Sequence, residues 1–173
     1  MGDRSAYDFQ FRSLDGAAMP LGDFEGRVLL IVNTASRCGF TRQYAALETL
    51  SREREVQGLT VIGIPCNDFG GQEPGAEPEI GDFCRSEYRV TFPLTSKAHV
   101  RGSEIAPFYR WAGGQAGFLG RPLWNFHKYL IGRDGRFITW FSSLTKPESA
   151  KIARALDHAL AGPRAGEGTI LAL

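Results

Sequence analysis

The most informative part of the sequence is RVLLIVNTASRCGFT, residues 27–41. Its first seven residues are mostly apolar and β-branched, which is typical of a strand buried inside a parallel sheet. Residues 43–55 follow with Tyr44 and Leu47 at helical spacing, which predicts a helix. Cys38 therefore lies in a strand-to-helix turn. Free backbone N–H groups and the helix macrodipole favour a thiolate there, and the thiolate is the nucleophilic form of cysteine.

Size and composition indicate one globular domain. The chain has 173 residues, of which 43% are hydrophobic, so it can bury a core of its own. We predict a single domain over residues 1–173, with a core over about 7–160 and a C-terminal tail at 161–173.

Charge and hydropathy exclude several classes of protein. A formal net charge of +1 provides no basic footprint for nucleic acid or for an anionic membrane. The strongest apolar run, residues 28–32, is too short to cross a bilayer, so we expect no stable membrane insertion. The first residues lead into no apolar segment of a secretory signal. We therefore expect a cytoplasmic protein.

The cysteines are Cys38, Cys66 and Cys84. An odd and widely spaced set, without an export signal, does not indicate a framework of structural disulfides. The wide gaps also lack the close pairs of a zinc site, so we expect no metal and no cofactor. Redox chemistry or inert buried thiols remain as interpretations.

Other segments predict the rest of a sheet. Residues 59–64 form a second apolar strand, and strand–helix–strand within this length is a βαβ crossover that makes the two strands parallel neighbours. Residues 7–11 and 18–21 predict an N-terminal hairpin. Residues 128–131 and 136–141 predict a second, antiparallel hairpin.

Helices and loops are predicted between these strands. Short helices are expected at residues 79–85 and 105–111, and a last amphipathic helix opens at Pro147. Residues 65–78 are rich in Gly and Pro and predict a long loop, which in a compact domain is usually functional. Residues 113–121 predict a flexible connection.

This order of elements predicts an α/β protein with a thioredoxin-like fold. It would have a central mixed β-sheet flanked by helices and an N-terminal β-hairpin. In that fold the first helix after the central strand begins near a redox cysteine, here Cys38. Thr41 stands where the second cysteine of a Cys-x-x-Cys pair would be. A simple dithiol shuttle is therefore disfavoured.

Four stretches resemble the glutathione peroxidase family. Residues 32–41 resemble its active-site turn, and residues 65–75, PCNDFGGQEPG, resemble its second signature. Residues 123–131, LWNFHKYLI, resemble the third, and residues 141–147 close the pattern. The resemblance runs over about residues 7–160. Three long motifs in the family's order are a specific signal.

The resemblance implies an active site and a reaction. It places Cys38, Gln72, Trp124 and Asn125 around a peroxide. The Cys38 thiolate would attack the O–O bond of hydrogen peroxide or of an organic or lipid hydroperoxide, become a sulfenic acid and release water or an alcohol. The two amides and the indole N–H are neutral donors that can stabilise the thiolate and the departing oxygen.

The resemblance also implies how the sulfenic acid is resolved. Cys84 would close a Cys38–Cys84 disulfide, which thioredoxin would then reduce. A disulfide needs Cα atoms within about 7 Å, so we expect residues 79–88 to unwind or shift on oxidation. Cys66 has no role in this scheme. The short connection over residues 113–123 resembles that of monomeric members.

Two alternatives remain open. Glutathione could be the reductant, with Cys84 only packing on an apolar helix face. The chain could instead be a peroxide sensor that passes its oxidation to a partner protein.

Two positions depart from the family's usual pattern. Asp68 stands where Gln is usual, and Arg42 stands where Pro is common.

Overall fold

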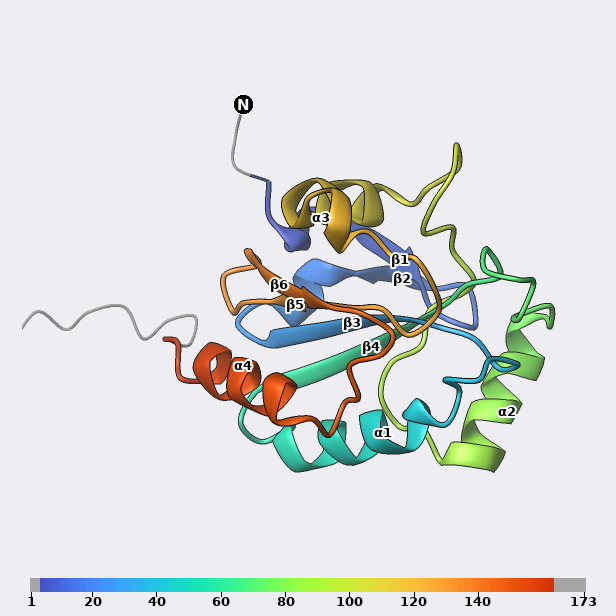
Figure 1. Ribbon diagram of the computed structural model, residues 1–173, viewed down its shortest axis with the longest axis horizontal. Coiled ribbons are helices and arrows are strands. Elements are labelled where there is room, and N and C mark those ends of the chain that lie inside the picture. The colour runs from blue at the N-terminus through green and yellow to red at the C-terminus, as the bar shows by residue number, and fades with distance from the viewer. Residues whose placement is uncertain (1–3, 164–173) are drawn as a thin grey trace, which may run out of the picture.

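The computed structural model describes residues 4–163 and has a four-stranded mixed sheet at its centre (Figure 1). The strand order is β4-β3-β5-β6, with β3 at Val28–Thr34, β4 at Leu59–Pro65, β5 at Lys128–Ile131 and β6 at Phe137–Phe141. β3 pairs in parallel with β4 and antiparallel with β5, which in turn pairs antiparallel with β6. Both the predicted crossover and the predicted second hairpin are confirmed.

Helices cover both faces of this sheet. α1 at Gln43–Arg54 and α4 at Ala150–Leu160 lie on one side, and α3 at Pro107–Ala116 lies on the other (Figure 1). α2, at Glu77–Tyr88, packs beside α1 near the end of the sheet. The thioredoxin-like arrangement of a mixed sheet between helices is therefore confirmed.

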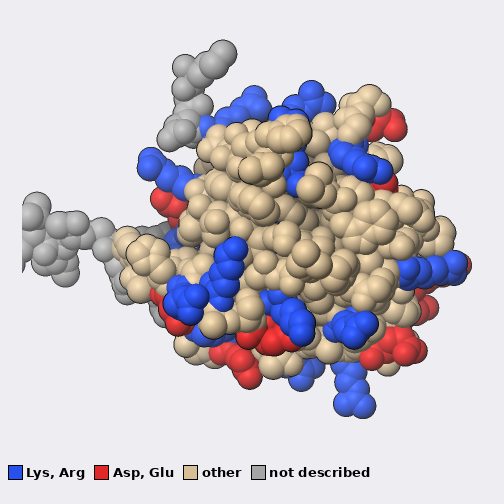
Figure 2. All heavy atoms as spheres, in the orientation of Figure 1, with Lys and Arg blue, Asp and Glu red and all other residues tan. Residues whose placement is uncertain are grey.

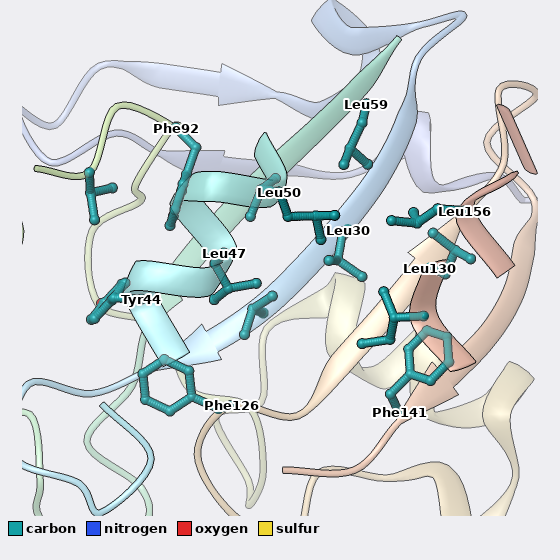
Figure 3. Packing of buried hydrophobic residues seen from close by; sticks show 14 of the residues in the cluster. Leu30, Tyr44, Leu47, Leu50, Leu59, Phe92, Phe126, Leu130, Phe141 and Leu156 are labelled. Carbon is teal, nitrogen blue, oxygen red and sulfur yellow. The ribbon is translucent and has the colours of Figure 1, made fainter. Parts of the chain in front are cut away.

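β3 is buried along its whole length because each of its faces meets an apolar cluster. Leu30 belongs to the cluster that contains Leu47 of α1 and Leu156 of α4 (Figure 3). Its neighbour Ile31 belongs to the cluster on the opposite face, with Phe108 of α3. Successive strand residues point to opposite faces, so a strand covered on both sides must be apolar throughout.

The N-terminal hairpin is present but shorter than the sequence predicts. β1 at Gln10–Arg12 pairs antiparallel with β2 at Ala18–Pro20. A short 3₁₀ helix, Ala6–Asp8, precedes β1 where the sequence predicts strand. The reason is a capping box, because Ser5 and the Asp8 carboxylate each satisfy a backbone N–H at the start of this turn.

Two helices extend beyond their predicted bounds. α2 begins at Glu77, because the Glu79 carboxylate accepts a hydrogen bond from the N–H of Ala76 (3.2 Å). It ends at Tyr88, and the capping residue Arg89 has a left-handed conformation (φ 52°). α3 continues through Gly113 to Ala116, into the predicted connection. Its buried side chains hold it together although glycine lowers helix stability.

α4 begins later than predicted. Its first residue is Ala150, because the Ser149 hydroxyl accepts a hydrogen bond from the N–H of Ile152 and so caps the helix.

Residues 164–173, most of the predicted tail, lie outside the described residues. The single-domain assignment stays a prediction. Within residues 4–163 no helix has the length and apolar character needed to cross a membrane.

The sheet topology brings three loops to the same edge. The parallel strands β3 and β4 both end there, at Thr34 and Pro65, while the antiparallel strand β5 begins there, at Lys128. The segment after β3 contains Cys38, the segment after β4 contains Gln72, and the segment before β5 contains Trp124 and Asn125. Sites in α/β folds commonly lie at the carboxyl ends of parallel strands.

Candidate active site

Cys38 lies in a tight turn between β3 and α1. The hydroxyl of Thr41 donates to the carbonyl of Ala35 (2.8 Å) and accepts from the N–H of Cys38 (2.9 Å). The N–H of Phe40 points to the Cys38 sulfur at 3.4 Å. α1 begins at Gln43, as the sequence predicts, so Cys38 lies in the turn between β3 and this helix. The backbone N–H of Phe40 in this turn is the donor to the sulfur, and the Cys38 side chain is half-buried.

Gln72 lies directly against this turn. Its carbonyl accepts a hydrogen bond from the N–H of Arg37 (3.0 Å), and its side-chain oxygen Oε1 accepts from Nδ2 of Asn125 (3.0 Å). Gly70 and Gly71 precede it with φ angles of +66° and +62°. These left-handed conformations suit glycine and turn the chain so that Gln72 faces Asn125.

The segment with Trp124 and Asn125 is fastened to the end of β3. The side chain of Asn33 donates to the carbonyl of Trp124 (3.1 Å), and the N–H of Phe126 donates to the carbonyl of Asn33 (2.6 Å). Phe126 has a φ of +65°, which is uncommon for a residue with a side chain. The buried Nζ of Lys128 donates a hydrogen bond to the carbonyl of Phe126 (2.6 Å). This turn buries Asn125 and leaves Trp124 38% exposed.

Trp124 packs on the glycine-rich loop. Its ring centroid lies 5.8 Å from that of Phe69, and a Cβ added to Gly70 would come within 3.3 Å of its ring. The absence of a side chain at Gly70 therefore permits the close approach of the indole. In residues 4–163, no hydrogen bond joins the Cys38 sulfur to the side chains of Gln72, Trp124 or Asn125. The structure brings these segments together through backbone contacts and the Gln72–Asn125 pair.

Cys84 lies on α2 and is fully buried. Cys38 and Cys84 are both free thiols, and Cys38 packs against the same apolar cluster that contains Cys84. Burial raises the pKa of Cys84 to about 11, although the neighbouring Tyr44 hydroxyl acts in the opposite direction. Burial likewise raises the pKa of Cys66 to about 12. Both thiols are therefore protonated near neutral pH.

Comparison with known proteins gives the family. The glutathione peroxidase family model matches residues 6–112. The chain belongs to the glutathione peroxidase family. It is 44% identical to the "Glutathione peroxidase-like peroxiredoxin gpx1" of Schizosaccharomyces pombe, over 82% of this chain and 91% of that protein. It is 42% identical to the "Hydroperoxy fatty acid reductase gpx1" of Synechocystis, over 84% of this chain and 91% of that protein.

Solved structures agree with this assignment. "Crystal structure of Trgpx in apo form" has a TM-score of 0.77 and 36% identity, covering 94% of this chain and 99% of that one. A thioredoxin-family thiol:disulfide interchange protein from Chlorobium tepidum has a TM-score of 0.66 at 15% identity, covering 92% of this chain and 99% of that one, and shows the fold alone. This glutathione peroxidase family member is accordingly a peroxidase of thioredoxin-like fold.

Sequence reasoning missed two residues that support the site. Asn33 fastens the segment before β5, and Lys128 supports the Phe126 turn from a position with 0% exposure. The signal for Lys128 was its place in an otherwise apolar strand, because a lysine is almost never fully buried without a polar partner. Asp68, which departs from the family's usual residue, accepts hydrogen bonds from His99 Nδ1 (2.7 Å) and the N–H of Val100 (2.8 Å).

A cavity of about 520 Å³ opens beside the Cys38 turn. Gly39 and Phe40 of the turn form one wall, and α1 and the segment before α4 form the others. Leu144 on its rim is 77% exposed. The cavity has the size of a small-molecule site, and the two residues that follow the candidate nucleophile line it.

Proposed function

We propose that this protein reduces hydrogen peroxide and organic or lipid hydroperoxides through Cys38 and is recycled by thioredoxin. The observation that supports this most directly is the turn that holds Cys38 half-buried with a backbone N–H aimed at its sulfur. The segments with Gln72 and with Trp124 and Asn125 end at the same edge of the sheet.

The proposed first step is attack of the Cys38 thiolate on one oxygen of the O–O bond. A new S–O bond forms, the O–O bond breaks, and the departing oxygen takes a proton and leaves as water or an alcohol. Cysteine is oxidised to the sulfenic acid and the peroxide is reduced. Donors that meet the departing oxygen stabilise its developing charge.

The Gln72–Asn125 hydrogen bond decides which donors are available for this step. Because Nδ2 of Asn125 donates to Oε1 of Gln72, the Gln72 amide is oriented with its Nε2 group opposite that contact. No hydrogen bond within residues 4–163 engages Nε2, so its N–H groups can serve the peroxide. The partly exposed indole of Trp124 offers a second neutral donor.

The cavity beside the Cys38 turn supports bulky substrates. Phe40 and Leu144 provide apolar contacts, and Gly39, the residue after the proposed nucleophile, also lines the cavity. A hydrocarbon chain attached to the hydroperoxide could lie there while its oxygens reach the sulfur. The name of the Synechocystis relative, a hydroperoxy fatty acid reductase, is consistent with such a substrate.

Cys84 is the proposed resolving cysteine. Its thiol would attack the Cys38 sulfenic acid, form the disulfide and release water. The two cysteines contact one apolar cluster, which supports the pairing. α2 contains Gly81 in its middle, and an interior glycine costs about 1 kcal/mol of helix stability relative to alanine. The expected unwinding of residues 79–88 would thus begin in a weak helix.

We expect a Cys84→Ala variant to lose thioredoxin-supported turnover by at least about 10²-fold, because no disulfide can form for thioredoxin to reduce. It should still consume about one equivalent of peroxide per Cys38. NADPH-coupled assays with the thioredoxin and glutathione systems measure both donors. Cys66→Ala is the matched control, since it also removes a buried thiol, and it should retain turnover.

Other outcomes of that experiment identify the alternatives. Full thioredoxin turnover by Cys84→Ala would contradict the resolving role. Turnover of the wild type with glutathione alone would favour glutathione as the donor. Slow turnover with both, together with a specific protein trapped on Cys38 of the Cys84→Ala variant, would favour the peroxide sensor.

The proposed enzyme acts as a monomer in the cytoplasm. The odd, widely spaced cysteines support a reducing compartment. The short link between α3 and β5 resembles that of monomeric members of the family. Size-exclusion chromatography with light scattering should give the mass of one chain, 19.0 kDa, and twice that mass would contradict the monomer.

A further inference from the structure

A second cavity, separate from the Cys38 turn, adjoins α3. Its volume is about 530 Å³, which falls in the range of small-molecule sites. Its walls come from residues 100–105, from α3 and from residues 121–123. None of the five proposed site residues lines it. The proposed peroxidase reaction therefore gives this cavity no role.

The lining of this cavity is strongly cationic. Arg101, Arg110 and Arg121 all line it, and no Asp or Glu of the described chain does. None of the three takes part in an ion pair among residues 4–163. In Figure 2, several Lys and Arg side chains lie at the top of the molecule, over α3 and the chain beside it, and others lie along its lower half. We call the site the arginine cavity.

Arg101 is held in place by neutral partners. Its Nη2 donates to the carbonyl of Asp68 (2.6 Å), and its guanidinium carbon lies 4.5 Å from the ring centroid of Phe69. The Asp68 carboxylate is engaged by His99 and by the N–H of Val100. The positive charge of Arg101 is thus fixed beside the cavity without a carboxylate to neutralise it.

Tyr109 of α3 also lines the arginine cavity, and only 2% of the residue is exposed. Its hydroxyl oxygen is itself buried and does not open into the cavity. The arginines are therefore the groups that a bound ligand would meet first.

We propose that the arginine cavity binds a small organic phosphate through its three guanidinium groups. A guanidinium matches two phosphate oxygens at once, and three cations suit a dianion better than a single carboxylate charge. The remaining walls would contact a hydrocarbon or aromatic group on the phosphate. The apolar residues that form them are Val100, Ile105, Pro122 and Leu123.

Isothermal titration calorimetry of the full chain at about 0.15 M salt, where exposed charges are well screened, tests this proposal. The probes are phenyl phosphate, inorganic phosphate, benzoate and phenol. Phenyl phosphate should bind most tightly, inorganic phosphate and benzoate more weakly, and phenol not at all. Arg110→Ala and Arg121→Ala should each weaken phenyl phosphate at least about tenfold. Arg154→Ala, an exposed arginine on α4, should leave binding unchanged.

Tyr109→Phe is a second control, at the wall of the cavity. Because the hydroxyl is buried and has no partner in the described chain, its removal should leave the melting temperature unchanged or raise it. Affinity for phenyl phosphate should stay close to that of the wild type.

Three results would overturn the proposal: no binding of phenyl phosphate to the wild type, equal binding by the two arginine variants, or benzoate binding as tightly as phenyl phosphate. Peroxidase turnover is measured separately, so either conclusion can fail alone.

Discussion

Replacing Cys38 with serine should reduce hydroperoxide turnover by at least about 10³-fold. Serine keeps the size and the turn hydrogen bonds of the residue. Its hydroxyl is not ionised near neutral pH and cannot be oxidised by a peroxide as sulfur can. The Phe40 N–H that faces the sulfur would remain in place without a nucleophile to stabilise. Peroxide consumption coupled to thioredoxin reduction measures the loss.

Cys66→Ala is the control for this prediction. Cys66 is also a free thiol, but it is buried and its pKa is raised to about 12, so it is protonated near neutral pH. Its removal should lower stability modestly and leave turnover within a few-fold of the wild type. Substantial turnover by Cys38→Ser would show that another group attacks the peroxide, and the proposed function would then be wrong.

Lys128→Met should stabilise the protein at low pH and destabilise it at high pH. Burial lowers the folded-state pKa of Lys128 from 10.5 to about 7, with Glu148 acting in the opposite direction. Between pH 7 and 10.5 the unfolded chain therefore binds more protons than the folded one. The free energy of unfolding of the wild type rises across that window through this residue.

The size of this effect follows from the pKa difference. Because the Lys128 pKa falls from 10.5 to about 7 on folding, burial of the charged lysine destabilises the folded protein by up to about 5 kcal/mol. This cost is present in full below pH 7 and disappears as the pH approaches 10.5. Methionine removes that cost, but it also removes the hydrogen bond from Nζ to the Phe126 carbonyl, worth about 1–3 kcal/mol when the carbonyl stays buried. Near pH 6 the variant should gain stability, and near pH 10.5 it should lose it.

Urea unfolding at pH 6, 8 and 10 measures this reversal. Lys146→Met, which replaces an exposed lysine, serves as the control and should show the pH profile of the wild type. A difference between Lys128→Met and wild type that stays constant with pH would contradict the assignment of a buried lysine with a lowered pKa.

Most of the fold could be predicted from the sequence because burial leaves a simple pattern. β3 is apolar at every position because both of its faces are covered, and α4 repeats its apolar residues at helical spacing. The ends of helices were less predictable. They depend on single contacts, such as the Ser149 cap of α4 and the Glu79 contact at the start of α2.

The candidate site also has a part that could be predicted from the sequence and a part that could not. Its motif residues could be chosen from the sequence because cysteine, amide and indole groups have recognisable chemistry. Their supports depend on strand register. Lys128 lies opposite Val32 in the β3–β5 pair, which places its side chain under the Phe126 turn. Nothing in the linear order of residues indicates that pairing, nor that Asn33 would fasten Trp124.

Because three loops meet at one edge of the sheet, the candidate site has a frame made of paired strands. The groups proposed to act on the peroxide are anchored to the ends of β3, β4 and β5, which share hydrogen bonds and cannot move independently. α2 and residues 100–105 lie outside this frame. Changes in α2 and in residues 100–105 would therefore leave the frame around Cys38 in place.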